Sequence, residues 1–183
     1  MNRRILLSNK DLEITLLRLC HQLVENHEDF DNTVLIGMQP RGSYLAKRIH
    51  ALLGNILGKD IPLGLLDSTF HRDDFRRRNM PLQANATQVP FLIENKKVVL
   101  VDDVLYTGRS VRAALDAMTA FGRPQSVELL VLIDRKYTRE LPIAARYVGK
   151  SIDSVQSQRV KVEWTNEADN ISEDAVWLIS DQA

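Results

Sequence analysis

The sequence has 183 residues, of which 44% are hydrophobic, and its 24 basic and 24 acidic side chains give a formal net charge of zero. A chain of this size and composition is expected to form one globular domain, residues 1–183, that needs no disulfide or metal to hold its core. The balanced charge argues against a nucleic-acid-binding field over the whole chain, but not against a local basic patch.

Several features indicate a cytoplasmic protein with no membrane partner. No apolar run approaches the roughly 18 residues of a membrane-spanning helix. Residues 1–7 carry positive charge, but their apolar part is too short for a signal peptide. The single cysteine, Cys20, lies in an apolar helical pattern, so we expect a buried, unreactive thiol in a reducing compartment.

The first third of the chain predicts two helices, each followed by a strand. Ser8 and Asp11 have the spacing of a capping box, and leucines 12, 16, 19 and 23 fall on one helical face, which predicts a helix over residues 9–26. The elements expected next are a buried strand at 33–38, a helix over 42–53 and a strand within 61–67.

Residues 68–91, called the arm below, differ from the segments around them. They are polar, contain three consecutive arginines and have prolines at positions 81 and 90. A connection of this length inside a compact domain is usually functional or disordered, so we expect a mobile arm or hairpin. The alternative is a surface loop without a function of its own.

The second half of the chain predicts a parallel sheet. Residues 97–102 form an apolar run that suits a strand covered on both faces, and residues 127–133 form another. The helix expected between them starts at Ser110 and stops at Gly122 and Pro124. Its apolar stripe consists of Val111, Ala114, Leu115 and Met118. The βαβαβ alternation implies a doubly wound sheet with right-handed crossovers, and shorter strands are expected near 146–148, 159–164 and 175–179.

The loop between the strand at 97–102 and the next helix has the composition of an anion cradle. The start of a helix presents unpaired N–H groups and a partial positive charge. Gly108 lets the backbone approach a phosphate closely, Thr107 and Ser110 add hydroxyl donors, and Arg109 adds charge.

Two adjacent carboxylates, Asp102 and Asp103, stand at the end of the same strand, where open α/β sheets bind their ligands. Like charges repel, so these acids are poorly placed to bind phosphate, but they are well placed to accept hydrogen bonds from two vicinal hydroxyls. A phosphate close to a diol describes a ribose 5-phosphate. The alternative is a turn whose acids and hydroxyls only cap the helix.

Residues 98–110 resemble the 5-phosphoribosyl-1-pyrophosphate (PRPP) binding signature of type I phosphoribosyltransferases. The resemblance implies the fold of that class, an α/β domain with a mainly parallel sheet, a flexible loop and a small base-binding hood. It also implies that Asp102 and Asp103 hold the ribose hydroxyls and that residues 106–110 enclose the 5′-phosphate. The implied PRPP and nucleotide contacts are Gln39, Pro40, Arg41, Gly42, Asp102, Asp103, Val104, Leu105, Tyr106, Thr107, Gly108, Arg109 and Ser110.

A second element of the class matches residues 37–42, again between a strand and a helix. The resemblance implies that this segment contacts pyrophosphate through backbone amides and a strained or cis peptide, which would precede Pro40, while Arg41 supplies charge. The arm matches the flexible catalytic loop. Its candidates for closing over pyrophosphate are His71, Arg72, Arg76, Arg77 and Arg78. The alternative is that these charged side chains are only exposed to solvent.

Nearly the whole chain is similar to the PyrR family, bifunctional pyrimidine operon regulators with uracil phosphoribosyltransferase activity. The similarity includes residues 42–48, 70–74, 101–112, 122–124, 132–135, 139–142 and 147–150. It implies that uracil and PRPP give UMP and pyrophosphate, with Asp102, Asp103 and Arg41 in the catalytic site and Ile133, Asp134 and Arg135 near the base. Mg²⁺ would bind chiefly through substrate oxygens and water, with Asp102 and Asp103 as the protein groups nearest to it.

The resemblance also implies binding to a pyrimidine operon leader mRNA and assembly into a homodimer or higher homo-oligomer. The RNA-binding candidates are Arg18, His21, Arg139, Arg146 and Lys150. The alternative is that these side chains form a solvated face or a subunit interface. Two departures from the family pattern, Leu17 and residues 136–138, fall in regions that the family associates with RNA. Two other functions stay open: a purine phosphoribosyltransferase acting on hypoxanthine, guanine or xanthine, and a non-catalytic nucleotide-sensing RNA-binding regulator.

Overall fold

The computed structural model describes residues 2–73, 84–155, 157–165 and 171–180, which form two β-sheets and three α-helices. The larger sheet has five parallel strands. In spatial order they are β3 (Leu63–Leu66), β2 (Thr33–Met38), β4 (Lys97–Leu105), β5 (Ser126–Lys136) and β6 (Tyr147–Asp153). The doubly wound parallel sheet predicted from the sequence is therefore confirmed.

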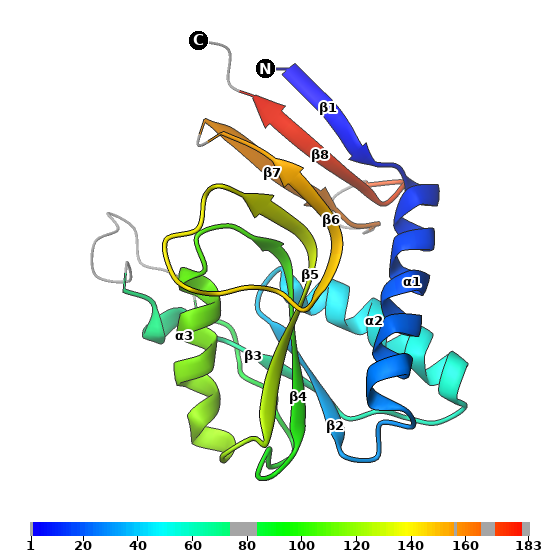
Figure 1. Ribbon diagram of the computed structural model, residues 1–183, viewed down its shortest axis with the longest axis vertical. Coiled ribbons are helices and arrows are strands. Elements are labelled where there is room, and N and C mark those ends of the chain that lie inside the picture. The colour runs from blue at the N-terminus through cyan, green and yellow to red at the C-terminus, as the bar shows by residue number, and fades with distance from the viewer. Residues whose placement is uncertain (1, 74–83, 156, 166–170, 181–183) are drawn as a thin grey trace.

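The smaller sheet, called the hood below, is antiparallel and joins the two ends of the chain. Its strands, in spatial order, are β1 (Asn2–Leu7), β8 (Ala175–Ser180) and β7 (Gln158–Glu163). Figure 1 shows the hood above the carboxyl ends of β4 and β5, with both termini beside it.

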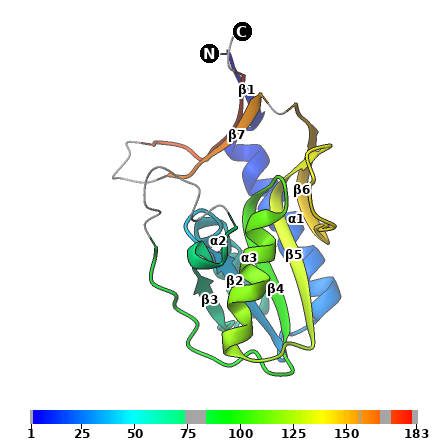
Figure 2. The same cartoon turned by 90° about the vertical axis from the view of Figure 1, so that its left-hand side faces the viewer.

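Helices cover both faces of the larger sheet. Helix α1 (Asn9–His27) and helix α2 (Gly42–Leu57) lie on one face, and helix α3 (Arg109–Met118) lies on the other (Figures 1 and 2). Val99 and Val101 of β4 belong to the core beneath α1 and α2, whereas Val98 and Leu100 belong to the core beneath α3. A strand packed on both sides must be apolar at consecutive positions, which explains the unbroken apolar run.

The ends of the first two helices follow from local chemistry. The Ser8 hydroxyl accepts a hydrogen bond from the Asp11 N–H at 3.3 Å, and the Asp11 carboxylate accepts one from the Ser8 N–H at 3.1 Å, which completes the expected capping box. Helix α2 runs to Leu57, beyond the predicted end at residue 53, and Gly58 ends it with a φ of 66°.

Three details of the sequence prediction are wrong. Leu115 is 36% exposed, and the small residues Ala113 and Ala117 join the buried face of α3 in its place. Strand β4 continues past Asp102 to Leu105. Strand β1 was not predicted: its first four residues are exposed, so it lacks an apolar signal, and its partner β8 lies at the other end of the chain.

The described part of the arm contains one short 3-10 helix, Thr69–His71, and an isolated bridge between Leu65 and Gln88. Arginines 76–78 lie outside the described residues. Cys20 is buried as expected, and burial raises the pKa of its thiol to about 12. Within the described residues, the helices are too short or too polar to cross a membrane.

Candidate functional site

The site forms where β4 extends beyond β2. The ladder between these strands ends at Gly37 and Val101, whereas the ladder between β4 and β5 continues to Leu105 and Asp134. Past Val101, β4 therefore has a strand on one side only. The open side is filled by the turn that leads from β2 into α2.

This turn approaches β4 closely because residue 42 is a glycine. A Cβ atom at Gly42 would lie 2.5 Å from the Val101 carbonyl oxygen and 2.9 Å from the Asp102 Cα. The peptide bond between Gln39 and Pro40 is cis, as expected from the resemblance. The Gln39 N–H donates to the Leu66 carbonyl at 2.9 Å, which ties the turn to the end of β3.

The two carboxylates of β4 have different surroundings. Asp103 is only 6% exposed, and its carboxylate accepts a hydrogen bond from the Arg41 Nε at 3.0 Å. The Asp102 carboxylate accepts the Asp103 N–H at 2.9 Å. Burial, together with the neighbouring charge of Asp103, raises the pKa of Asp102 well above its usual range. The site therefore contains one acid with a cationic partner and one that resists ionisation.

Arg41 also joins the site to the hood. Its guanidinium donates a second hydrogen bond, of 2.8 Å, to the Val162 carbonyl in β7. One side chain at the start of α2 thus connects a carboxylate of the parallel sheet with the antiparallel sheet above it. The sequence offered no sign of this contact, because Arg41 and Val162 are 121 positions apart.

The expected phosphate loop lies between β4 and α3. Gly108 has a φ of 91°, in the left-handed region that favours glycine, and it directly precedes the first residue of α3. As the N-cap, Gly108 has no side chain to accept a hydrogen bond from the first turn of the helix. A ligand oxygen can accept those hydrogen bonds instead, beside the hydroxyls of Thr107 and Ser110.

Two neighbouring cavities bring these segments together. One, of about 290 Å³, lies against the phosphate loop, and the other, of about 360 Å³, lies against the turn at residues 38–41 and the carboxylates. Both are lined by Arg72, Asp102, Val104 and Ser110. The structure therefore gathers the predicted pyrophosphate turn, carboxylates and phosphate loop around two cavities that share these four residues.

The stem of the arm rests on the start of α3. The Arg72 guanidinium donates to the Ser110 hydroxyl at 3.2 Å, and the Arg112 guanidinium donates to the His71 carbonyl at 2.8 Å. The Asp73 carboxylate forms an ion pair with Arg109. Of the predicted arm residues, Arg72 contacts the site directly and His71 contributes its backbone.

The three residues expected near the base do not line the two cavities. Ile133 is fully buried, and Arg135 is 5% exposed. The Arg135 guanidinium stacks 4.2 Å from the centre of the Tyr106 ring and donates to the Ser154 hydroxyl at 2.8 Å. Asp134 forms an ion pair with Arg139. Val104 lines both cavities instead, and Leu105 and Tyr106 line the one beside the phosphate loop.

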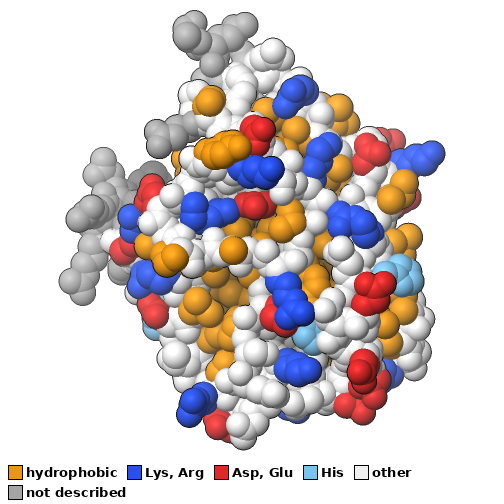
Figure 3. Space-filling model, viewed as in Figure 1, with side chains coloured by type: hydrophobic (Ala, Val, Ile, Leu, Met, Phe, Trp, Pro, Cys, Tyr) orange, Lys and Arg blue, Asp and Glu red, His pale blue; other side chains and the backbone are white. Residues whose placement is uncertain are grey.

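Most of the RNA-binding candidates lie along α1 and β6. Arg18 of α1 donates to the Gly149 carbonyl of β6 at 2.5 Å, Lys150 donates to the Leu6 carbonyl at 2.8 Å, and Arg146 pairs with Glu128. His21 is exposed on α1. Arg139 is separate from this group, because it donates to the Tyr106 carbonyl in the phosphate loop. On this face of the molecule, basic side chains are interspersed with acidic ones (Figure 3).

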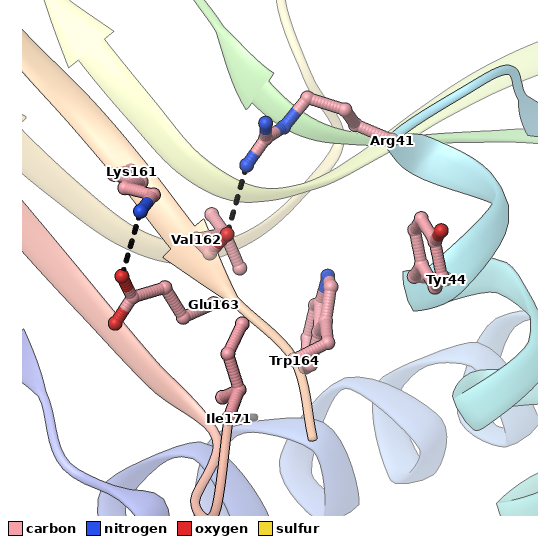
Figure 4. A pocket seen from close by; sticks show the side chains of 7 residues that line it. All are labelled: Arg41, Tyr44, Lys161, Val162, Glu163, Trp164 and Ile171. Atoms are coloured by element: carbon pink, nitrogen blue, oxygen red, sulfur yellow. Dashed lines mark hydrogen bonds and ion pairs between the residues drawn. The ribbon is translucent and has the colours of Figure 1, made fainter. Parts of the chain in front are cut away.

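A third cavity, of about 450 Å³, lies between α2 and the hood (Figure 4). Its lining residues are Arg41, Tyr44, Lys161, Val162, Glu163, Trp164 and Ile171. Except for Arg41, none of them was a candidate for the nucleotide site from the sequence. They come from segments more than a hundred residues apart and form no local motif.

In the part of the chain that the structure describes, no three His, Cys, Asp or Glu side chains form a group that could hold a metal ion. Asp102 and Asp103 supply carboxylate oxygens, and Asp103 is already paired with Arg41. Two such groups suit a Mg²⁺ ion that keeps most of its ligands from substrate and water.

A carboxylate pair beside a loop at the start of a helix, at the carboxyl end of a doubly wound sheet, is the arrangement expected of a phosphoribosyltransferase. The sequence profile of the phosphoribosyl transferase domain family matches residues 3–167. The chain is 43% identical over 176 residues to the bifunctional protein PyrR of Deinococcus deserti, covering 96% of this chain and 95% of that one. It is 42% identical over 174 residues to the bifunctional protein PyrR of Bacillus cereus AH820, covering 93% and 96%. The chain belongs to the PyrR family.

Solved structures confirm the type I phosphoribosyltransferase fold. The hypoxanthine phosphoribosyltransferase of Trypanosoma cruzi superposes with a TM-score of 0.71 at 16% identity, over 97% of both chains. That of Staphylococcus aureus superposes with a TM-score of 0.65 at 20% identity, over 86% of this chain and 80% of that one. At these identities the likeness concerns the fold and not the base.

Proposed function

We propose that the protein transfers the phosphoribosyl group of PRPP to uracil, forming UMP and pyrophosphate. The observation that carries this function is the position of Asp102 and Asp103, one short loop away from the helix start at Arg109. Membership of the PyrR family supports uracil as the acceptor base.

The reaction exchanges one bond at the anomeric carbon of the ribose. The bond to pyrophosphate breaks, its electron pair leaves with the pyrophosphate, and N1 of uracil bonds to the carbon and gives up its proton. Positive charge develops on the ribose before the new bond is complete. Groups that hold the ribose and the leaving group in place therefore account for most of the catalysis.

Each carboxylate has a distinct part in holding the ribose. Asp103, paired with Arg41, is placed to accept a hydrogen bond from one ribose hydroxyl. Asp102, whose pKa is raised by burial, can exist as the neutral acid and then donate as well as accept. Arg41 and the backbone of residues 39–42 contact the pyrophosphate, and Mg²⁺ carried by PRPP offsets its charge.

The phosphate loop anchors the other end of the substrate. The Thr107 and Ser110 hydroxyls and the first amides of α3 bind the 5′-phosphate, and Arg72 adds a positive charge beside Ser110. Fixing the phosphate also fixes the distance from the ribose to the base. The base then lies beside Val104 and Tyr106, which line the cavity next to the phosphate loop.

A panel of bases tests this function. The protein is incubated with PRPP and Mg²⁺ and with uracil, hypoxanthine, guanine or xanthine, and pyrophosphate release is followed. Uracil should give the highest kcat/KM, and a preference for a purine would contradict the proposal. The double variant Asp102→Asn with Asp103→Asn should keep its circular dichroism spectrum and lose transfer, whereas full turnover would remove both acids from the mechanism.

We also propose that a homo-oligomer of this chain acts in the cytoplasm and binds the leader mRNA of a pyrimidine operon. The positions of Arg18 and His21 on α1, of Lys150 on β6 and of Arg146 directly before β6 support this second activity. UMP should strengthen binding in a gel-shift assay with that RNA, and doubling the salt should weaken it. A protein that binds UMP but not the RNA would be an enzyme without the regulatory function.

A further inference from the structure

Two segments of the arm meet at the carboxylate of Asp67, which directly follows β3. One of its oxygens accepts a hydrogen bond from the Thr69 N–H at 2.6 Å. The other accepts one from the Asn85 N–H at 2.5 Å and one from the Asn85 side-chain amide at 3.2 Å. A single side chain thus joins residues 68–73, the first described segment of the arm, to residues 84–91, the second.

Both segments help to line the cavity that contains the two carboxylates of β4. This cavity of about 360 Å³, called the carboxylate cavity below, is lined by Asp102 and Asp103. The arm contributes four further lining residues: Ser68, Thr69, Arg72 and Asn85. Asp67 is not among the residues that line the carboxylate cavity, but lines a separate cavity of about 270 Å³. Asp67 therefore acts on a ligand of the carboxylate cavity only through the residues that it holds.

The hydrogen bonds at Asp67 require a charged carboxylate. All three come from N–H donors, and they end on two different oxygens. Burial alone would raise the pKa of Asp67, but the hydrogen bonds from Thr69 and Asn85 outweigh it and hold the pKa below its ordinary value. Asp67 is therefore ionised at neutral pH, and both of its oxygens are acceptors. An asparagine would keep one acceptor oxygen and turn an NH₂ group towards one of the donors.

Further hydrogen bonds fix the second segment beside the end of β3. The Asp67 N–H donates to the Thr87 hydroxyl at 3.1 Å. The side-chain amide of Gln39, from the turn that precedes α2, donates to the Ala86 carbonyl at 2.7 Å. These contacts surround Asn85, so the residue that the second segment contributes to the carboxylate cavity is positioned by the sheet and by Asp67.

We propose that Asp67 is a positioning residue of the transferase, whose carboxylate holds Thr69 and Asn85 in the wall of the carboxylate cavity when PRPP binds. The proposal rests on the proposed function, because PRPP is the substrate of that reaction. Without the carboxylate, the two segments lose the connection that Asp67 provides, and PRPP has to order them as it binds. Ordering a segment opposes binding, so the affinity for PRPP falls.

Steady-state kinetics of two matched variants test this role. Asp67→Asn should raise the KM for PRPP by about tenfold, the equivalent of one hydrogen bond to a charged group, and should change kcat by less than about threefold. Asp60→Asn is the control, since Asp60 is an exposed acid that precedes the same strand at its other end. Its KM should equal that of wild type, and equal KM values for PRPP in the two variants would overturn the proposal.

Hydrogen exchange gives a second readout that does not depend on turnover. The backbone N–H groups of Thr69 and Asn85 both donate to Asp67. In Asp67→Asn, at least one of these two amides should exchange about tenfold faster than in wild type. The Gln88 N–H, which donates to the Leu65 carbonyl at 2.8 Å, is the internal reference and should keep its rate. Unchanged exchange at Thr69 and Asn85 would overturn the proposal, as would an equal acceleration at Gln88.

The two readouts separate a failure of this proposal from a failure of the transferase function. An active wild-type enzyme whose Asp67→Asn variant keeps its KM for PRPP would leave the function intact and remove the positioning role. A kcat that falls at an unchanged KM would do the same, because it reports fewer folded molecules. A wild-type protein that transfers to none of the bases would refute the function and with it the role in PRPP binding. Hydrogen exchange would then still show whether Asp67 joins the two segments.

Discussion

The Nε atom of Arg41 lies 3.0 Å from a carboxylate oxygen of Asp103, while another nitrogen of the same guanidinium lies 2.8 Å from the Val162 carbonyl oxygen. A planar guanidinium donates to these two acceptors from two different nitrogen atoms, whereas all the donors of a lysine ammonium belong to one nitrogen. The side chain that is expected to contact pyrophosphate therefore also connects a carboxylate of β4 with the hood.

Two replacements of Arg41 distinguish the effect of its positive charge from the effect of its two hydrogen bonds. Arg41→Lys keeps the charge but loses the double contact, so kcat/KM for PRPP should fall by about 10- to 100-fold, the equivalent of one hydrogen bond to a charged group. Arg41→Met removes the charge as well and should reduce kcat/KM further. Pyrophosphate release measures both variants. A lysine variant with wild-type kcat/KM would show that only the charge is needed.

Replacing Asp102 should increase stability at neutral pH while it reduces turnover. The pKa of Asp102 is raised above its usual 3.8 in the folded protein, so the unfolded chain loses this proton first as the pH rises. The wild-type protein therefore loses stability as the pH rises from about 4 towards the folded-state pKa. An asparagine cannot ionise and avoids that loss.

Urea unfolding measures this effect. Asp102→Asn should be more stable than wild type at pH 7, and the difference should shrink towards pH 4. Asp153→Asn, a change of an exposed acid in β6, is the control. A lower stability of Asp102→Asn at pH 7 would contradict the burial of this carboxyl.

Two glycines of α2 should respond to alanine in opposite ways. At Gly42, a methyl group would lie 2.5 Å from the Val101 carbonyl oxygen, so α2 must move away from β4 and stability should fall by about 1–3 kcal/mol, with loss of activity. At Gly54, the nearest atom is 3.4 Å away, an ordinary contact, and alanine in a helix interior should add about 0.5–1 kcal/mol. Thermal unfolding measures both, and equal effects would contradict the close approach at Gly42.

The buried His27, which is not part of the candidate site, should make the stability of the protein depend on pH. The Nε2 of His27 lies 2.9 Å from a Glu128 carboxylate oxygen and 3.1 Å from the Tyr147 hydroxyl, and its Nδ1 lies 3.1 Å from the Thr33 hydroxyl. Burial lowers the pKa of His27 below its ordinary 6.5, and the nearby Glu128 opposes this only in part. As the pH falls below about 6.5 the unfolded chain takes up this proton first, so stability falls.

His27→Gln should therefore show a smaller loss of stability than wild type between pH 7 and pH 5, by about 1 kcal/mol in urea unfolding. His21→Gln changes an exposed histidine on the same helix and serves as the matched control. A pH dependence that is identical in wild type and His27→Gln would assign the loss to other groups.

The sequence could predict features that lie within one continuous segment, but not contacts between segments that are far apart in the chain. Residues 98–110 contain the strand, the carboxylates and the phosphate loop in one continuous run, so their chemistry could be read without the structure. The cis peptide before Pro40 came from a resemblance and is confirmed. The contact of Arg41 with Val162 arises from chain segments that meet only in the fold.

The sequence also could not predict which side chains are buried and which polar groups have partners in the protein. Leu115 fits the helical period but lies at the edge of the stripe, where two alanines pack more closely against the sheet. Arg135 stands in a segment expected near the base, yet it is buried against Tyr106 and Ser154. Periodicity predicts which face of an element is buried, but not which of its polar groups have protein partners.

The pairing of β1 with β8 means that the hood is completed late in synthesis. Residues 2–7 leave the ribosome first, but their partner at residues 175–180 is the last of the described strands to be made. A growing chain can assemble β2 to β6, with Asp102 and Asp103 at the end of β4, before Arg41 has a hood to contact. Removing the β8 segment should therefore release the first strand as well, and leave a parallel sheet whose nucleotide site is open on one side.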